Sequence, residues 1–362
     1  YNPAFVHMDG TRKRFTGYAT DITTDKAIAW LDSRDKTKPF FLMCQHKAPH
    51  RTFSPALRHL KAFEGVDIPE PDSLFDDYSN RHKSLAKHEM GIGNHFYWDY
   101  DLKFRKGERG GMRLPGNNPT PLTRYQPEYD RMNPEQRKVW DAHFGPLNQK
   151  FLADFKAGKL SDKDIVRWKY QRYMKNYLAT VKAVDESVGR LVAYLEKNSL
   201  SENTIVIYSS DQGFYLGEHG WYDKRWMFEE SLVMPFIIRW PGAVKPGSRP
   251  EALIQNIDYA PTFMNIAGGD VPEEVQGLSI VPVLKGEKKK VRDSIYYAYY
   301  EIGEHNVPQH FGVRTDRYKL IHFPVSDEWN MFDLKEDPTE MKSVYGDAKY
   351  TEVQKELHAE YQ

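Results

Sequence analysis

Two side chains that carry oxygen atoms, Asp211 and Gln212, follow the apolar, β-branched run 204–208 after two serines. Such a run predicts a strand that ends at the edge where open α/β sheets keep their ligand sites. Carboxylate and amide oxygens suit a hard cation, and Lys224, thirteen residues after Asp211, could bind an anionic group beside it. The alternative is an ordinary turn, in which the Asp211 side chain bonds its own backbone.

A second group of reactive side chains follows the apolar run 40–44, for which we predict a strand. Lys47, His50 and Arg51 come soon after it and could bind a tetrahedral anion at the strand end. His50 could also protonate a leaving group near neutral pH. A solvated basic loop explains the same residues without a function, but two such groups at two strand ends strengthen each other.

The elements that would position these side chains alternate between helices and strands. Residues 20–31 and 164–197 have apolar side chains at helical spacing, and each predicted helix precedes one of the two predicted strands. This order is typical of a doubly wound α/β sheet. A further strand is predicted over 234–242, and a short helix over 258–267.

Two regions depart from that alternation. Residues 61–161 are polar and predict a loop-rich excursion, with short helices near 134–143 and 147–155, that would shape a pocket. After the basic linker 285–290, a small antiparallel sheet is predicted, followed by a helix from Thr351. Its strands are expected over 294–300, 311–315, 318–323 and 330–334.

Composition limits the possible functions. Lys plus Arg and Asp plus Glu both number 51, so no global charge points to nucleic acid or to an anionic membrane as a partner. No apolar run is long enough to predict a membrane span. The single cysteine, Cys44, excludes an internal disulfide, and we interpret it as a small, buried hydrophobic side chain.

Taken together, the motifs resemble those of the type I, formylglycine-dependent sulfatases of the alkaline-phosphatase-like superfamily. The resemblance rests on residues 17–21, 47–51, 210–225, 258–262 and 312–320 and covers nearly the whole chain. It implies an α/β fold with a mixed sheet flanked by helices, plus a small C-terminal subdomain with an antiparallel sheet and a helix. Residues 1–285 would be the C-terminal part of the catalytic domain, with 61–161 as a loop-rich insertion, and 286–362 would be the subdomain.

The resemblance also implies roles for individual residues. Asp211 and Gln212 match calcium ligands, with Gln212 standing where many relatives have Asn. Lys224 matches the lysine that contacts the sulfate, and His50 matches the histidine beside the sulfate ester, so both are candidate catalytic residues. Lys47 and Arg225 are weaker candidates for substrate contacts.

The family's nucleophile is a formylglycine made from Cys or Ser in a Cys/Ser-x-Pro-x-Arg motif, and no residue of this chain fits that motif. Cys44 is followed by Gln45-His46-Lys47, without the proline. The paired aspartates of the family's N-terminal calcium site are missing too. We therefore expect the formylglycine upstream of Tyr1, and we expect this chain alone to be inactive.

Residues 296–301, 305–314 and 318–323 look like those of bacterial N-acetylglucosamine-6-sulfatases or mucin-desulfating sulfatases. His310 is similar to a histidine that such enzymes place near the sugar, although a histidine that closes a β turn is an equal interpretation. The expected function is that of an exo-acting, periplasmic or secreted sulfatase of sulfated glycans, with 6-O-sulfated N-acetylglucosamine as a candidate substrate.

Two other functions remain open. One is that of a phosphodiesterase or phosphonate hydrolase of the same superfamily, which usually needs a second metal site with further His and Asp ligands. The other is that of a catalytically silent, carbohydrate-binding relative.

Overall fold

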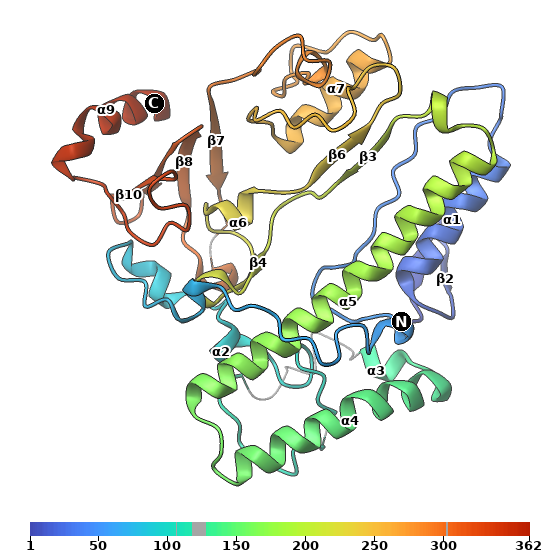
Figure 1. Ribbon diagram of the computed structural model, residues 1–362, viewed down its shortest axis with the longest axis vertical. Coiled ribbons are helices and arrows are strands. Elements are labelled where there is room, and N and C mark those ends of the chain that lie inside the picture. The colour runs from blue at the N-terminus through green and yellow to red at the C-terminus, as the bar shows by residue number, and fades with distance from the viewer. Residues whose placement is uncertain (106, 118–127, 302) are drawn as a thin grey trace. The chain divides into compact units, whose positions relative to one another are not determined.

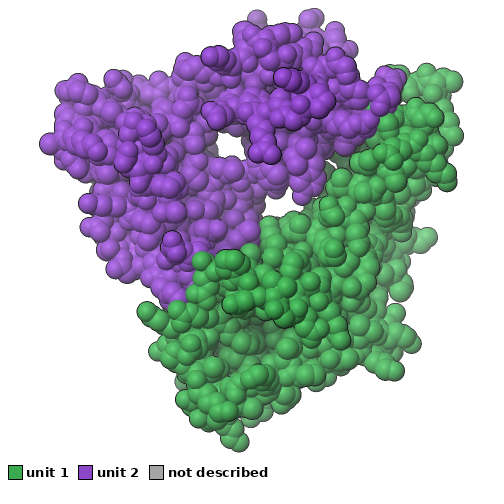
Figure 2. Space-filling model, in the orientation of Figure 1, with its two compact units in different colours: residues 1–70, 91–201 green, residues 71–90, 202–362 purple. Residues whose placement is uncertain are grey.

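The computed structural model describes residues 1–105, 107–117, 128–301 and 303–362. The chain forms two compact units (Figure 2). Unit 1 comprises residues 1–70 and 91–201, and unit 2 comprises residues 71–90 and 202–362. The domain division predicted near residue 285 stays a prediction.

Two long helices organise unit 1 (Figure 1). Helix α1 (Ala19–Ser33) packs along α5 (Asp162–Lys197), and the hydroxyl oxygens of Thr24 and Ser187 lie 2.5 Å apart between them. The start of α5 is fixed by a capping box, in which the Ser161 side chain accepts a hydrogen bond from the N3 backbone. Both predicted helices are confirmed with nearly the same bounds.

A third long helix of unit 1, α4 (Pro134–Lys156), replaces the two short helices predicted there. Pro146 lies inside it, where proline removes a backbone hydrogen bond and usually ends a helix. The helix continues because Trp140, Phe144 and Phe151 are buried, and this packing outweighs the local preference.

The remaining elements of unit 1 are short: β1 (Ala4–Val6), β2 (Arg12–Arg14), α2 (Ile92–His95) and α3 (Glu128–Arg131). Strands β1 and β2 pair antiparallel. No helix within the described residues combines the length and the apolar composition that crossing a bilayer requires.

The strand predicted over residues 40–44 does not form, although all five residues are described. Phe41 and Met43 are 63% and 60% exposed, and Cys44 is half-buried rather than buried as predicted. The Cys44 Sγ lies 3.7 Å from His46 Nε2. The continuous apolar run fits a buried strand, but no strand of the described chain pairs with these residues.

In unit 2, β3 (Val206–Ser209) pairs antiparallel with β6 (Phe236–Arg239), and β4 (Tyr215–Leu216) pairs with β5 (Tyr222–Asp223). The predicted strand before Asp211 is therefore present. It is less buried than predicted, since Tyr208 is 36% exposed. The helices of this part are α6 (Glu229–Leu232), α7 (Tyr259–Ile266) and α8 (Val281–Leu284).

The C-terminal part of unit 2 is the predicted antiparallel sheet, which is confirmed with its terminal helix (Figure 1). Its strands lie in the order β10-β9-β8-β7, namely β7 (Ser294–Tyr299), β8 (His310–Thr315), β9 (Tyr318–Phe323) and β10 (Glu328–Asp333). Val313, Leu320 and Met331 pack with Leu357 of α9 (Thr351–Tyr361). Alternate residues, such as Ile321 and Phe332, belong to a second core cluster with Trp226 and Phe228.

Leu320 provides a test of this core because its side chain is fully buried. We expect Leu320→Ala to lower the free energy of unfolding by about 2–5 kcal/mol, since the substitution leaves a cavity. The matched variant Val325→Ala, at a position 84% exposed, should change it by less than about 0.5 kcal/mol. Urea unfolding followed by tryptophan fluorescence measures both, and equal effects would contradict the core described above.

Candidate active site

The predicted metal ligands lie in the turn that follows β3. Asp211 is exposed and Gln212 is half-buried. Among the hydrogen bonds of the described residues, the Asp211 carboxylate accepts only one, from the Ser210 hydroxyl at 3.4 Å, and none from a backbone N–H. The carboxylate therefore accepts no backbone N–H of its own turn, and its role as a metal ligand stays a prediction.

Gly213, the next residue, lies against α6. Its N–H donates to Ser231 O at 2.9 Å. A Cβ atom at this position would lie 2.2 Å from Glu230 O and 2.6 Å from Val233 O, closer than any side chain tolerates. The backbone beside the predicted metal ligands is therefore held directly against α6, and only glycine fits there.

The predicted sulfate-binding lysine, Lys224, directly follows β5, whose last residue is Asp223. The Asp223 carboxylate lies 3.2 Å from Lys224 Nζ, 3.0 Å from Arg225 Nη1 and 2.9 Å from His305 Nε2. Burial by itself would raise the pKa of Asp223. The hydrogen bond from His305 and the charges of Arg225 and Lys224 outweigh that effect and hold the pKa well below its usual range. One ionised carboxylate thus gathers three basic side chains.

The loop that carries these residues has an unusual backbone. Asp223 has φ of 77° and Arg225 has φ of 104°, a region that side chains rarely adopt. The Arg225 N–H donates to Ser231 Oγ at 3.2 Å, and Arg225 O accepts the Tyr297 hydroxyl at 2.6 Å. Hydrogen bonds to α6 and β7 therefore hold the backbone N–H and the backbone carbonyl of Arg225.

The second predicted group of residues lies in unit 1. Lys47 and His50 are exposed, and His50 Nδ1 lies 3.0 Å from Arg51 O. Because a carbonyl only accepts, Nδ1–H is the donor, and a proton that the ring transfers would be carried on Nε2. Arg51 is fixed by a bidentate pair with the buried Asp101, at 2.6 and 2.5 Å.

His310 begins β8, and its side chain is completely buried. Its ring is stacked on those of Trp226 and Tyr297, with centroids 5.4 and 5.5 Å away. Its Nδ1–H donates to Pro308 O at 2.9 Å, the local contact that the turn interpretation expects. Burial lowers the pKa of His310 to about 4, so the ring is neutral at pH 7. Its predicted contact with a sugar stays a prediction.

Sequence reasoning missed two members of the Asp223 cluster, Asp223 itself and His305. The position of Asp223 directly before Lys224 is a signal that was available in the sequence. His305 offered none, because its place depends on a turn in which His305 has φ of 52° and its backbone carbonyl accepts the Glu89 N–H at 2.7 Å. That all the predicted residues of units 1 and 2 serve one site stays a prediction.

The burial of His310 predicts a pH dependence of stability. The ring has an ordinary pKa of 6.5 when unfolded and about 4 when folded, so the unfolded chain takes up its proton first as the pH falls. The neutral His310 ring therefore contributes its full share to the free energy of unfolding above pH 6.5. This contribution, up to roughly 3 kcal/mol, is lost as the pH falls toward 4. His310→Phe should remove this loss. Unfolding free energies of both proteins at pH 7.5 and pH 4.5 measure it, and equal losses would contradict it.

Comparison with known proteins supports one family. The sulfatase family model matches residues 2–269, and the model of the N-sulphoglucosamine sulphohydrolase C-terminal region matches residues 217–362. An N-acetylglucosamine-6-O-sulfatase of Bacteroides thetaiotaomicron is 48% identical over 99% of this chain, which spans 63% of that relative's length. Human N-acetylglucosamine-6-sulfatase is 26% identical over 74% of the chain and 36% of its own length.

Solved structures agree with these relatives and with the predicted fold class. One, of a protein in complex with its substrate D-glucosamine-2-N,6-O-disulfate, matches with a TM-score of 0.90 and 46% identity, over 100% of this chain and 72% of that one. A phosphonate monoester hydrolase of Agrobacterium radiobacter matches with a TM-score of 0.60 and 20% identity, over 95% of this chain and 61% of that one, which shows the shared fold alone. The chain has the alkaline-phosphatase-like fold and belongs to the sulfatase family.

Proposed function

We propose that the complete protein hydrolyses sulfate esters on sugars as an exo-acting sulfatase, with 6-O-sulfated N-acetylglucosamine as its substrate class. The observation that carries the proposal is the Asp223 cluster, in which the Asp223 carboxylate pairs with Lys224 and Arg225 of its own loop and with His305 from a distant turn. The name of the relative that is 48% identical and the sulfated glucosamine in the matched structure support this substrate class.

The sulfatase family implies a bound metal ion and a formylglycine nucleophile. Within the proposal the ion is calcium, because the donors that this chain offers, Asp211 and Gln212, are oxygen ligands. No group of three or more His, Cys, Asp or Glu side chains in the described part of the chain is arranged to hold a metal ion. Asp211 and Gln212 would therefore supply two of the roughly six to eight oxygens that calcium takes.

The roles of the chain's own residues follow from their charge. A sulfate monoester is anionic and repels a nucleophile, so its oxygens must be neutralised before sulfur is attacked. Lys224 would bind one of these oxygens, and a bound calcium ion would neutralise others. His50 would give its Nε2 proton to the sugar oxygen as the S–O bond breaks, because an alkoxide is a poor leaving group.

The remaining parts of the proposal concern the substrate and the compartment. Arg225 and Lys47 would contact the sugar or its sulfate. His310 is completely buried and stacked on Trp226, so its role near the sugar would be indirect, through the rings that pack on it. Formylglycine would come from a residue outside these 362, because none of them lies in a Cys/Ser-x-Pro-x-Arg motif. Sulfated glycans are extracellular, so we propose that the protein is periplasmic or secreted.

A phosphodiesterase or phosphonate hydrolase is the second candidate, since the Agrobacterium enzyme shares the fold. Such enzymes usually need a second metal site, and the donors at the Asp211 turn offer no sign of one within the described residues. A catalytically silent, carbohydrate-binding protein is the third candidate. Activity measurements on the complete protein separate all three.

In the complete protein, we expect Lys224→Ala and His50→Ala each to lower kcat/KM for a sulfated sugar by about 10²–10⁴-fold, because each removes transition-state charge stabilisation or proton transfer. Lys245→Ala and His7→Ala, at exposed positions, serve as matched controls and should keep the wild-type rate. Turnover of an aryl sulfate should greatly exceed that of an aryl phosphate. Unchanged rates in the first pair, or a preference for phosphate, would overturn the assignment.

Calcium dependence gives a separate test. Chelation should abolish turnover of the complete protein, and added calcium should restore it. Asp211→Asn should weaken calcium binding at least tenfold, because a neutral amide replaces a carboxylate ligand. Calorimetric titration with calcium measures the affinity directly, and the exposed residue Asp270 provides the control Asp270→Asn. Equal affinities of the two variants would remove Asp211 from the ligand set.

A further inference from the structure

We propose that α6 is a clamp through which the C-terminal sheet positions the predicted metal turn and the Lys224–Arg225 loop together, with Glu229 and Lys319 as positioning residues. The inference deepens the proposed function and rests on it. The effect of α6 on the backbone of the two loops can also be tested without turnover.

One side of α6 holds the two candidate loops. Ser231 O accepts the Gly213 N–H at 2.9 Å, and Ser231 Oγ accepts the Arg225 N–H at 3.2 Å. Ser231 is buried, so water does not compete for these bonds. A single residue of α6 thus binds the backbone beside Asp211 and Gln212 and the backbone beside Lys224.

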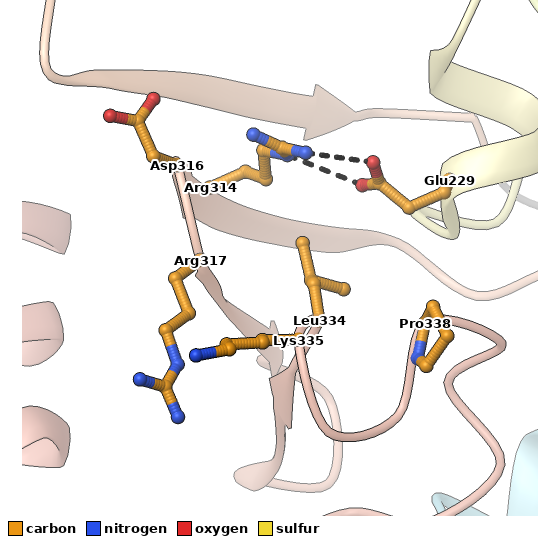
Figure 3. A pocket seen from close by; sticks show the side chains of 7 residues that line it. All are labelled: Glu229, Arg314, Asp316, Arg317, Leu334, Lys335 and Pro338. Atoms are coloured by element: carbon orange, nitrogen blue, oxygen red, sulfur yellow. Dashed lines mark hydrogen bonds and ion pairs between the residues drawn. The ribbon is translucent and has the colours of Figure 1, made fainter.

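The other side of α6 is tied to the C-terminal sheet through Glu229. The Glu229 carboxylate accepts Arg314 Nε at 3.3 Å and Nη2 at 2.9 Å, and the two side chains face each other across the strands in Figure 3. Lys319 Nζ lies 2.9 Å from the same carboxylate and 2.7 Å from Glu340 Oε1. The Glu229 N–H in turn donates to Glu340 Oε2 at 2.7 Å.

These contacts form a largely buried network of charged side chains. Its two cations, Arg314 and Lys319, face two carboxylates, Glu229 and Glu340, and the Lys319 and Glu340 side chains are completely buried. Burial would raise the pKa of Glu229, but Lys319 and Arg314 lower it to about 2, so the Glu229 carboxylate is ionised at any working pH. Loss of one charge leaves its partner uncompensated, which is strongly unfavourable in a buried position.

On its Glu229 side, α6 is held by this network of charges more than by close packing. A pocket of about 510 Å³ lies beside the Glu229–Arg314 pair, lined also by Asp316, Arg317, Leu334, Lys335 and Pro338 (Figure 3). Side chains therefore do not pack solidly around Glu229 on that side. Phe228, just before α6, is buried in the core, and Leu232 at the end of α6 packs against the same core cluster. The ion pairs add the contacts that hold the Glu229 side of the helix against the C-terminal sheet.

The test uses Glu229→Gln, which keeps the side-chain shape and removes its charge, in the complete protein. Asp333→Asn is the matched control, because Asp333 makes a bidentate pair with Arg317 in the same sheet, at 2.8 and 2.6 Å, without a hydrogen bond or ion pair to α6. We expect Glu229→Gln to weaken calcium binding several-fold and to lower kcat/KM at least tenfold. Asp333→Asn should keep the wild-type calcium affinity and kcat/KM, although it should lower the thermal stability about as much as Glu229→Gln does.

Hydrogen exchange supplies a readout that does not need turnover. The clamp predicts that Glu229→Gln speeds exchange of the Gly213 and Arg225 amides at least tenfold and spares the Tyr222 amide, which donates to Met90 O at 3.0 Å. Uniform acceleration of all three, or the same pattern in Asp333→Asn, would overturn the clamp and leave α6 a merely structural element.

A second variant protects the test against misfolding. Ser231→Ala removes only the hydroxyl that accepts the Arg225 N–H, so it should speed exchange at Arg225 and raise KM without a large loss of stability. No effect at Arg225 would contradict the clamp. The two proposals fail differently: unchanged hydrolysis in Lys224→Ala refutes the proposed function, whereas unchanged exchange at Gly213 and Arg225 in Glu229→Gln refutes the clamp alone.

Discussion

Compensation of a buried carboxylate is the interaction on which each of the two groups of candidate residues depends. In unit 2, Asp223 is buried and is stabilised by three basic side chains. In unit 1, Asp101 is buried and is stabilised by the bidentate Arg51. Both arrangements follow from the same rule, since a buried charge without a partner costs several kcal/mol.

The two units use this rule in the same way. The arginine tied to the carboxylate directly follows the side chain to which we assign chemistry: Arg51 follows His50, and Arg225 follows Lys224. The ion pair fixes the backbone at the neighbouring residue. The reactive side chain can then stay accessible to a substrate, as His50 is, without losing its position.

Much of the fold could be predicted from the sequence because its elements have recognisable local patterns. Helices α1 and α5 have apolar side chains at helical spacing, and strands β7 to β10 follow one another as short runs rich in aromatic and aliphatic residues. Residues 40–44 show the limit of this reasoning. A continuous apolar run predicts a buried strand, but it does not say whether a partner strand exists. Pro146 shows the converse, since distant packing keeps α4 intact across a residue that usually ends a helix.

Only those candidate residues that have a signal in their neighbouring sequence could be predicted. Asp211, Gln212 and Lys224 could be predicted as candidates because they lie near a predicted strand end and in motifs that resemble a family. Asp223 had a local signal, its position directly before Lys224, whereas His305 required knowledge of a contact between residues far apart in the chain. The burial of His310 was equally hidden, because the rings that cover it come from Trp226 and Tyr297, on different segments.

The backbone explains why local sequence could not reach further. Asp223, Arg225 and His305 all have positive φ although none is glycine, and each such residue costs about 1–3 kcal/mol. These conformations persist only where surrounding contacts determine them. Ser231 and Tyr297 hold Arg225 from two sides, and Glu89 holds His305 through its backbone. The shape of the loop that carries Lys224 is therefore a property of the packing of unit 2, and local preferences alone would favour a different loop.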